Sequence, residues 1–212
     1  EQEIPFVIFG ALYQVSPAVF MSLAEKNLTE PADMVEARIA TTAGGRPVVS
    51  ALLRSAGLPD DQWEYVPSGF DPTPIIEDKA DFFHGFRTGQ GVALELEGNE
   101  MNYITMSQFN YNPYETPLFG LEDEVSGQKD LLVRFVRASI KGWEWATANP
   151  DGAAKMTVDK YGRDGLTIEQ QTAEGEAQVS DVVTDETDEK GLFCMDLARW
   201  DDLPDATLPW ER

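Results

Sequence analysis

The sequence predicts an α/β fold that continues into a helical C-terminal part. Residues 36–108 alternate about five times between short apolar runs typical of strands and segments with helical spacing, which indicates a sheet with crossover helices. Beyond residue 120 the apolar residues recur at helical spacing only. The length of 212 residues suits one large domain or two small ones, and a hydrophobic content of 42% is enough for a packed core.

The N-terminal quarter of the chain predicts two strands and two helices. Residues 4–13, IPFVIFGALY, form a continuous apolar run typical of a strand that is buried on both faces. In the following SPAVFMSLAEKN, we expect Ser16 to cap a helix that has Pro17 at its first position. Residues 37–58, ARIATTAGGRPVVSALLRSAGL, indicate a strand, a glycine turn and a helix that ends at Gly57.

The alternation of strands and helices continues through the next fifty residues, punctuated by glycine and proline. The expected elements are, in order, a strand in residues 62–69, a short helix or turn in 71–78, a strand in 79–86, a helix closed by Gly98 in 87–98, and a strand in 101–109.

The C-terminal part predicts four helices. The first, in residues 126–149, is long and amphipathic, and its apolar face would hold Leu132, Phe135, Val136, Ile140 and Trp143. Two more are expected in residues 150–162 and 166–185, the second opened by a capping box of Thr167 and Gln170, and a short one in 195–203. The acidic stretch TDETDEK, residues 184–190, is expected to be a solvated loop.

The charge of the chain restricts its partners. Asp and Glu number 38 against 16 Lys and Arg, a net charge of −22, whereas nucleic acids and anionic membrane surfaces attract basic proteins. We therefore expect no nucleic-acid binding and an acidic, solvated surface; a pocket tuned for a cationic ligand stays open as an alternative. No run approaches the roughly 18 apolar residues of a membrane span. The chain opens directly on a strand-like run, so we expect its N-terminus to be processed or cut.

The reactive residue types are scarce. His84 is the only histidine and Cys194 the only cysteine, so neither an internal disulfide nor a zinc site of the usual kind is expected, and no cofactor is indicated. We expect His84 to be hydrogen-bonded or to line a pocket rather than to act as a base, because no Gly-x-Ser-x-Gly elbow accompanies it. The apolar neighbours of Cys194 indicate a buried, inert thiol. No catalytic and no metal-binding residues are predicted.

Two further features could contact a ligand. The turn TTAGGRP, residues 41–47, would direct backbone N–H groups at an anion or carbonyl, although a plain strand-to-helix turn explains it equally well. Aromatic residues follow several strands, and pockets of α/β sheets form beyond the carboxyl ends of strands. Such rings could stack on a flat ligand, with amides supplying hydrogen bonds, or could belong to the core; they are Phe70, Phe83, Phe86, Phe109, Tyr111 and Tyr114, with Gln90, Asn110 and Asn112.

Residues 6–34 resemble the segment of bacterial ABC-transporter substrate-binding proteins that enters their second lobe, in which an apolar strand leads into Tyr-Gln, then Ser-Pro and then an apolar helix. Residues 44–58, 69–104 and 132–154 continue in the order that this family has. The most similar branch is that of the thiamine-precursor (pyrimidine) and alkanesulfonate-binding proteins. One departure is Asp33-Met34-Val35-Glu36-Ala37, where the family often has Asp-Leu-x-Gly-Lys.

The resemblance implies an α/β fold of the type 2 periplasmic-binding-protein kind, with two lobes and a cleft, and a first lobe whose N-terminal part is absent. Residues 1–15 would be the crossing strand and hinge, 16–104 the second lobe, and 105–212 the return strand and the C-terminal helices of the first lobe. If the first lobe is incomplete, its open sheet edges could pair with a second copy to form a homodimer.

The resemblance further implies a solute-binding component of an ABC importer that captures a thiamine-precursor pyrimidine or a similar small heterocycle by lobe closure, without bond chemistry. Its partners would be this ligand and a membrane permease, and its location periplasmic or extracytoplasmic, with a lipoprotein anchor as one form. The implied ligand-contact residues are Tyr13, Gln14, Thr42, Gly44, Gly45, Phe70, Asp71, Phe86, Thr88, Gln90 and Tyr111.

Two alternative functions remain open at this point. One is an enzyme of the related pyrimidine-synthesis type that would use His84. The eukaryotic members of that type carry a Cys-rich motif, which the lone Cys194 does not reproduce. The other is a truncated module that binds no ligand and serves in interaction or domain swapping.

Overall fold

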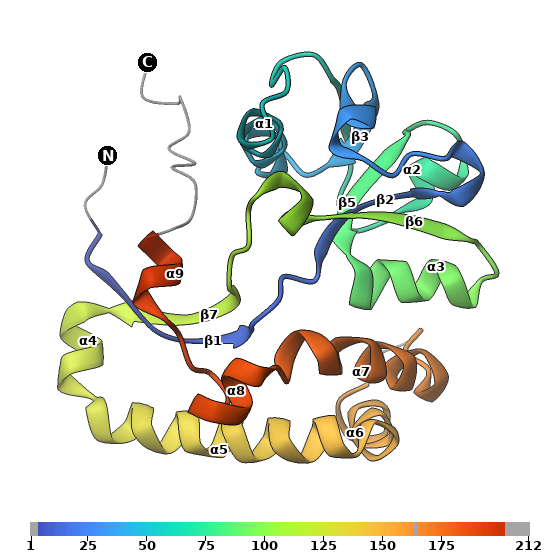
Figure 1. Ribbon diagram of the computed structural model, residues 1–212. Coiled ribbons are helices and arrows are strands. Elements are labelled where there is room, and N and C mark those ends of the chain that lie inside the picture. The colour runs from blue at the N-terminus through green and yellow to red at the C-terminus, as the bar shows by residue number, and fades with distance from the viewer. Residues whose placement is uncertain (1–3, 163–164, 202–212) are drawn as a thin grey trace. The chain divides into compact units, whose positions relative to one another are not determined.

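The protein is described from a computed structural model that covers residues 4–162 and 165–201. The chain divides into two compact units (Figure 1). Unit 1 combines the N-terminal residues up to Ser16 with Tyr114–Arg199, and unit 2 combines Pro17–Pro113 with the residues from Trp200 on. The main part of unit 2, Pro17–Pro113, is therefore inserted into the chain of unit 1, and we call residues 16–17 the first and 113–114 the second connection.

Unit 2 is built on a five-stranded mixed sheet with the strand order β4-β3-β5-β2-β6. Strand β3 pairs in parallel with β4 and β5, and β2 pairs antiparallel with β5 and β6. The strands are β2 (Ala18–Leu23), β3 (Arg38–Thr41), β4 (Glu64–Pro67), β5 (Phe82–Phe86) and β6 (Met101–Thr105). The helices are α1 (Gly45–Ser55), α2 (Thr73–Ile76) and α3 (Val92–Leu96), with a π-helical turn at Arg87–Gly91 before α3 and short 3₁₀ turns at Ala24–Lys26, Pro31–Met34 and Met106–Phe109.

Both faces of this sheet are covered, which explains the predicted alternation of strands and helices. Neighbouring strand residues point to opposite faces, so Phe20 and Val19 enter different cores. The core around Phe20 includes the apolar face of α1, and the core around Val19 includes Ile75 of α2 and Leu94 of α3. Figure 1 shows α1 and α3 on opposite sides of the sheet.

One element of unit 2 was predicted wrongly. The segment after Ser16 is the strand β2 and not a helix capped by Ser16 with Pro17 at its first position. The reason is its position in the sheet, because β2 pairs with strands on both sides and its first five residues are buried. An apolar run such as AVFM suits a position buried on both sides, which the centre of this covered sheet provides.

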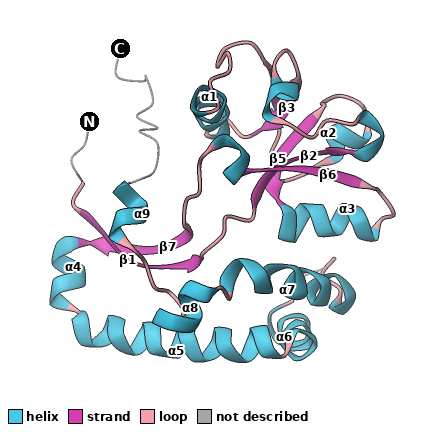
Figure 2. Ribbon diagram, viewed as in Figure 1, coloured by secondary structure: helices cyan, strands magenta, loops and turns pink. Residues whose placement is uncertain are grey.

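Unit 1 has a two-stranded antiparallel sheet followed by helices, and Figure 2 shows only helix and loop after β7. The sheet consists of β1 (Phe6–Tyr13) and β7 (Glu115–Leu121). The helices are α4 (Glu122–Gly127), α5 (Lys129–Ala148), α6 (Pro150–Met156), α7 (Ile168–Val182), α8 (Asp185–Lys190) and α9 (Leu197–Asp201), with a π-helical turn at Thr157–Tyr161. A small core of Leu12, Tyr13, Val182 and Phe193 connects the sheet with α7 and the chain after α8.

Three expectations for unit 1 need correction. The first half of β1 is not buried on both faces, since Phe6 and Ile8 are exposed. Phe135 of α5 is also exposed, whereas the other four residues predicted on its apolar face are partly buried. The acidic stretch after Val183 is the helix α8 and not a loop, because the hydroxyl of Thr184 caps it and its first-turn carboxylates favour the positive end of the helix dipole.

The predicted cap of α7 is half confirmed. The Thr167 hydroxyl accepts a hydrogen bond from the backbone N–H of Gln170, at 3.1 Å. The Gln170 side chain does not complete the capping box but donates to Glu174 instead, at 2.8 Å. Among the helices of the described ranges, none combines the length and the apolar composition that crossing a membrane would require.

Candidate functional site

The predicted ligand-contact residues of unit 2 follow the carboxyl ends of its strands. Because β3, β4 and β5 run parallel, their carboxyl ends meet at one edge of the sheet. Strand β6 runs in the same direction as β5, since both are antiparallel to β2. The loops after these strands hold Thr42 and Gly44 after β3, Phe70 and Asp71 after β4, Thr88 and Gln90 after β5, and Tyr111 after β6. The edge of a sheet where such loops meet is where α/β folds bind ligands.

The glycine turn after β3 is tightly packed at one of its two glycines. A Cβ atom at Gly45 would lie 2.0 Å from the Thr41 hydroxyl oxygen and 3.4 Å from Nδ1 of His84, so a larger residue there would displace the Thr41 side chain. Gly44 meets no such obstacle, because the nearest atom to a Cβ there is 3.9 Å away. The Thr42 hydroxyl accepts a hydrogen bond from the backbone N–H of Gly45, at 3.1 Å. This N–H, the first of α1, therefore already has an acceptor within the protein. The turn therefore has a clear structural role, and ligand contact there stays a prediction.

His84 lies beside this turn on β5 and is held in place by neutral groups. Its ring stacks on Phe20, with the centroids 4.8 Å apart, and Nδ1 is 3.3 Å from the Thr41 hydroxyl oxygen. Burial lowers the pKa of His84 to about 4, because the charged imidazolium would lose its hydration. His84 is therefore neutral at pH 7 and hydrogen-bonded, as the sequence predicted.

The side chain of Gln90 connects two of the loops at the edge of the sheet. Its Oε1 accepts the backbone N–H of Phe86, at 3.0 Å, and its Nε2 donates to the carbonyl oxygen of Phe70, at 3.4 Å. The rings of Phe70 and Phe86 are exposed, Phe70 to 83% of its surface. Gly85 permits this arrangement, because a Cβ there would lie 3.1 Å from Oε1 of Gln90. An exposed aromatic ring held on an ordered loop is the feature of unit 2 that is best suited to stack on a flat ligand.

Other predicted contact residues of unit 2 are engaged within the protein. Asp71 accepts the backbone N–H of Thr73, at 3.0 Å, and its hydroxyl, at 2.5 Å, and these bonds hold the pKa of Asp71 below its usual value. Thr88 is buried. Tyr111 packs against the core that contains Phe20. A role of these three residues in ligand binding stays a prediction.

The two predicted residues of unit 1 lie just before the first connection: Tyr13 is the last residue of β1, and Gln14 follows it. The Tyr13 hydroxyl donates to Oε1 of Gln178, at 2.8 Å. Gln14 is buried, and its amide donates to the carbonyl oxygens of Ala11 and Cys194, both at 3.2 Å. Both side chains thus fix the end of β1, and their contact with a ligand stays a prediction.

A polar cluster in unit 1, which sequence reasoning did not find, holds both connections between the units. The Arg199 guanidinium donates to the carbonyl oxygen of Gln14, beside the first connection, and lies 3.9 Å from the ring centroid of Tyr114, beside the second. Glu186 accepts a hydrogen bond from the Tyr114 hydroxyl, at 3.3 Å, and lies 3.7 Å from Arg199. The Tyr114 hydroxyl also accepts the backbone N–H of Asp196, at 2.9 Å. We name Gln14, Tyr114, Glu186, Asp196 and Arg199 the connection cluster.

Glu115 is a second functional candidate that the sequence did not reveal. It begins β7, directly after the second connection, and accepts a hydrogen bond from the Ser16 hydroxyl at the first connection, at 3.4 Å. Burial raises the pKa of Glu115, because the carboxylate loses hydration there. The only available signal was its position after the aromatic run YNPY, and one acidic residue among 38 does not stand out.

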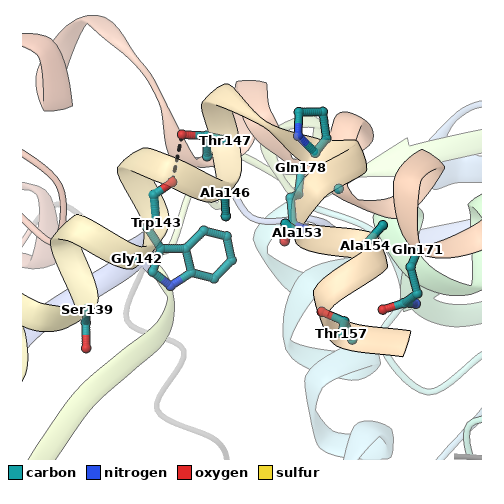
Figure 3. Close-up of a pocket in the computed structure, with 12 residues that line it drawn as sticks. Ser139, Gly142, Trp143, Ala146, Thr147, Ala153, Ala154, Thr157, Gln171 and Gln178 are labelled. Carbon is teal, nitrogen blue, oxygen red and sulfur yellow. Dashed lines mark hydrogen bonds between the residues drawn. The ribbon is translucent and has the colours of Figure 1, made fainter. Parts of the chain in front are cut away.

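The pocket drawn in Figure 3 lies elsewhere in unit 1, among α5, α6 and α7, and its volume is about 380 Å³. Trp143 and small residues line it, and three of its polar side chains already have partners inside the protein. The Thr147 hydroxyl donates to the carbonyl oxygen of Trp143, at 2.8 Å, Gln171 donates to Glu174, and Gln178 accepts from Tyr13. None of the predicted ligand-contact residues lines this pocket, so it is not the candidate site.

Metal and thiol chemistry find no support in the described parts of the chain. No group of three or more His, Cys, Asp or Glu side chains there could hold a metal ion. Cys194 is partly buried, and burial, together with the nearby Glu186 carboxylate, raises the pKa of its thiol, which keeps the thiol protonated at neutral pH.

Comparison with known proteins first identifies the class. The solved structure of the periplasmic aliphatic sulphonate binding protein SsuA from Escherichia coli matches 89% of this chain and 66% of its own, with a TM-score of 0.67 and 10% identity. The fold is thus that of the periplasmic binding proteins. The desulfurization enzyme DSZB has a similar fold, with a TM-score of 0.55 and 13% identity over 97% of this chain and 72% of its own.

The family follows from the sequence. The family model described as NMT1/THI5 like matches residues 1–153, and the chain belongs to this family. Two curated relatives are each 25% identical over 162 residues, or 74% of this chain. They are the formylaminopyrimidine-binding protein of Halalkalibacterium halodurans and the riboflavin-binding protein RibY of Chloroflexus aurantiacus. The match spans 49% of the first relative and 46% of the second, about half of each. The resemblance and the α/β fold class of the periplasmic binding proteins are confirmed, whereas the two lobes, their bounds and the cleft between them stay predictions.

Proposed function

We propose that the protein is part of a solute-binding component of an ABC importer and that it binds a small, flat heterocycle of the pyrimidine kind. The observation that carries the proposal is the edge of the unit 2 sheet, where Gln90 holds the loops of two exposed rings, Phe70 and Phe86. The names of the two curated relatives support the choice of ligand class, because an aminopyrimidine and riboflavin are both flat nitrogen heterocycles.

Titration calorimetry with three ligand classes tests this proposal. We expect binding of formylaminopyrimidine or riboflavin and none of an aliphatic sulfonate, and we expect Phe70→Ala to weaken binding about tenfold, since one stacked ring contributes roughly 1–1.5 kcal/mol. Tyr161→Ala is the matched control, because Tyr161 is similarly exposed but lies in unit 1, outside the candidate site. Equal affinity of the Phe70 variant and the control would contradict the assigned site, and no binding of any heterocycle would contradict the ligand class.

We further propose that capture occurs by closure of two lobes, with unit 2 as the second lobe and unit 1 as part of the first. The connection cluster supports this, because Arg199 binds groups beside both connections at once. Arg199→Gln removes the charge and the stacking on Tyr114, and we expect it to change the ligand dissociation rate while the stability of unit 2 stays as it is. Stopped-flow fluorescence with the bound ligand measures the rate. An unchanged rate would remove the connection cluster from the mechanism.

We propose that no bond chemistry takes place. Two observations support this: His84 is a neutral side chain of low basicity, and both curated relatives are named for binding. After incubation, mass spectrometry should recover a bound pyrimidine unchanged. A product that forms with the wild type and not with His84→Ala would instead establish the enzyme alternative.

The partners and the location follow from the same proposal. The ligand would pass to a membrane permease, and the protein would act in the periplasm or outside the cytoplasmic membrane, free or anchored as a lipoprotein. The supporting observation is the structural similarity to SsuA, a periplasmic protein. Immunodetection in fractionated cells, with a cytoplasmic marker protein as the control, tests the location.

A further inference from the structure

His84 has one ring nitrogen that the described part of the protein leaves unused. Its Nδ1 lies 3.3 Å from the Thr41 hydroxyl oxygen, whereas Nε2 has no hydrogen-bond partner among the described residues. Every fully buried polar side-chain atom of those residues does have a partner, so Nε2 is not fully buried and solvent reaches it. A packed ring with one open polar atom is the kind of group that fixes the orientation of a ligand in an otherwise apolar site.

The burial along β5 places His84 at the boundary between the core and the candidate site. Phe82, His84 and Phe86 are alternate residues of the strand, so their side chains share the face of the sheet that α1 covers. On this face Phe82 is completely buried, His84 is partly exposed and Phe86 is 38% exposed. His84 is therefore the one polar side chain of β5, and it lies directly next to the edge where the loops of the candidate site meet.

The neighbours of His84 hold its ring in one orientation. The ring stacks on Phe20, which lies directly opposite on β2. The glycine turn after β3 closes the side of Nδ1, since a Cβ atom at Gly45 would lie 3.4 Å from this nitrogen. Thr41 occupies the same side through its hydroxyl group. The ring is thus fixed by its stacking face and by Nδ1, and Nε2 stays available for a contact outside the protein.

The neutral state of the ring restricts the ligand groups that Nε2 can recognise. Burial lowers the pKa of His84 to about 4, so Nε2 donates or accepts a single hydrogen bond at pH 7 and supplies no charge. An anionic group would be bound best by the imidazolium, and burial opposes the formation of that ion. A ring nitrogen, an amino group or a carbonyl oxygen of an uncharged heterocycle suits a neutral imidazole.

We propose that His84 is a specificity-determining residue whose Nε2 forms a hydrogen bond with an uncharged nitrogen or oxygen at the edge of the bound heterocycle. Phe86 stacks on the same ring, because side chains two residues apart on a strand are roughly 7 Å apart and face the same way. Thr41 is a positioning residue that selects the tautomer of His84 through Nδ1. This inference rests on the proposed function and adds the residue that reads the polar edge of the ligand.

Nitrogen NMR of the full-length product of the gene that encodes this chain, with isotope-labelled histidine, tests the contact directly. Titration calorimetry first establishes the binding of formylaminopyrimidine or riboflavin. His84→Gln assigns the two ring resonances of His84 by removing them. On ligand binding we expect the Nε2 resonance to shift and the Nδ1 resonance to stay in place, because only Nε2 gains a partner.

Two variants measure the contribution of His84 to affinity. His84→Phe keeps a ring against Phe20 but removes both nitrogens, and we expect about tenfold weaker binding from the loss of one hydrogen bond. His84→Gln retains a neutral polar tip and should recover part of this loss. Ser22→Ala is the matched control, because it removes a hydrogen bond to the carbonyl oxygen of Leu28 at the other end of β2 and should bind like the wild type. Urea denaturation shows that each variant is folded.

The positioning role of Thr41 has its own readout. Thr41→Val removes the hydroxyl partner of Nδ1, so we expect the Nδ1 resonance to shift in the absence of ligand. The variant should also bind the heterocycle more weakly than the wild type does, though less weakly than His84→Phe. Thr41→Ser keeps the hydroxyl and should restore both the resonance and the affinity. An unchanged Nδ1 resonance in Thr41→Val would remove Thr41 from the proposal.

The outcomes separate this inference from the function on which it rests. If neither heterocycle bound to the wild type, the proposed function would fail, and the role of His84 with it. If a heterocycle bound while the Nε2 resonance stayed unchanged, or if His84→Phe bound it as tightly as the wild type does, only the role of His84 would be wrong. An aliphatic sulfonate that bound and shifted the Nε2 resonance would overturn the selectivity for uncharged groups.

Discussion

The two units differ sharply in how much apolar surface they bury, although they have similar lengths. Among the described residues, twenty apolar residues are buried in unit 2 and only seven in unit 1. Unit 2 packs both faces of its sheet, whereas the longest helix of unit 1 buries no residue. An amphipathic pattern thus reports which face of an element is apolar, but not whether the same 212 residues cover that face.

The largest expected effect compares one phenylalanine from each unit. Phe82→Ala removes a completely buried ring from the core of unit 2, and we expect it to cost about 3–5 kcal/mol of unfolding free energy. Phe135→Ala, on the exposed side of α5, should change the stability of the 212-residue chain by less than about 0.5 kcal/mol. Urea denaturation followed by circular dichroism measures both, and similar costs would contradict the difference between the units.

Acid should weaken unit 2 through His84. Its folded pKa of about 4 lies below the ordinary value of 6.5, so the unfolded chain binds the proton more readily. Stability is therefore lost as the pH falls from about 6.5 towards 4, by a total on the order of 3 kcal/mol. Urea denaturation at intervals from pH 7 to 4.5 should show this loss in the wild type and a smaller loss in His84→Gln. If the unfolding free energies of the wild type and of His84→Gln fell equally with pH, the loss of stability would not come from His84.

A smaller effect is expected from the ion cluster at the other edge of the same sheet. Two nitrogens of the Arg38 side chain bind the Asp81 carboxylate, at 2.7 and 3.0 Å, and Lys26 lies 3.1 Å away. These bonds, those from Arg38 above all, hold the pKa of Asp81 far below its usual value. Asp81→Asn should cost about 2 kcal/mol at pH 7, because a charged hydrogen-bond acceptor is lost.

The pH dependence of the stability lost in Asp81→Asn tests whether the loss comes from the carboxylate charge. The contribution of Asp81 is complete above its unfolded pKa of about 3.8 and is lost as the pH falls towards the lower folded value, so the variant and the wild type should converge in acid. Asp78→Asn is the control, because the Asp78 carboxylate is mostly exposed and should contribute less than about 1 kcal/mol. A pH-independent difference would indicate a packing effect instead.

The smallest predicted effect lies in unit 1. Thr184 caps α8, and Thr184→Ala should cost about 1 kcal/mol. Because unit 1 has a small core, we expect the loss to appear as faster hydrogen exchange in Asp185–Lys190 alone. Ser180→Ala, an exposed hydroxyl on α7, is the control. If exchange also rose throughout α7, unit 1 would be more cooperative than its packing indicates.

Local patterns predicted most elements of unit 2 because each of its helices and strands is covered within the unit. The exception, β2, shows where local rules fail: Ser-Pro is a helix start signal, yet the central position in the sheet decides the conformation of the residues after it. The prediction of a loop at residues 184–190 was wrong for the opposite reason, since a local signal was overlooked. The hydroxyl of Thr184 caps α8, and this outweighs an acidic composition that otherwise favours a loop.

The candidate site was predictable in part, since strand ends can be located from sequence. The positions of Phe70, Gln90 and the glycine turn follow from the strands that precede them. The connection cluster could not be predicted, because Arg199 and Gln14 are 185 residues apart and no local pattern relates them. The tight contact of Gly45 with Thr41 and His84 was equally hidden, as it depends on the pairing of β3 with β5.

The insertion of unit 2 into unit 1 has a consequence for biosynthesis. Phe6 pairs with Leu121, so β1 leaves the ribosome long before its partner strand exists, while all five strands of the unit 2 sheet have emerged by Pro113. Translation proceeds at about 5–20 residues per second, so roughly 6–23 s pass between the synthesis of β1 and that of β7. Unit 2 can begin to fold within this time. During that interval an apolar strand stands unpaired on the nascent chain, and molecular chaperones have their clearest target at Phe6–Tyr13.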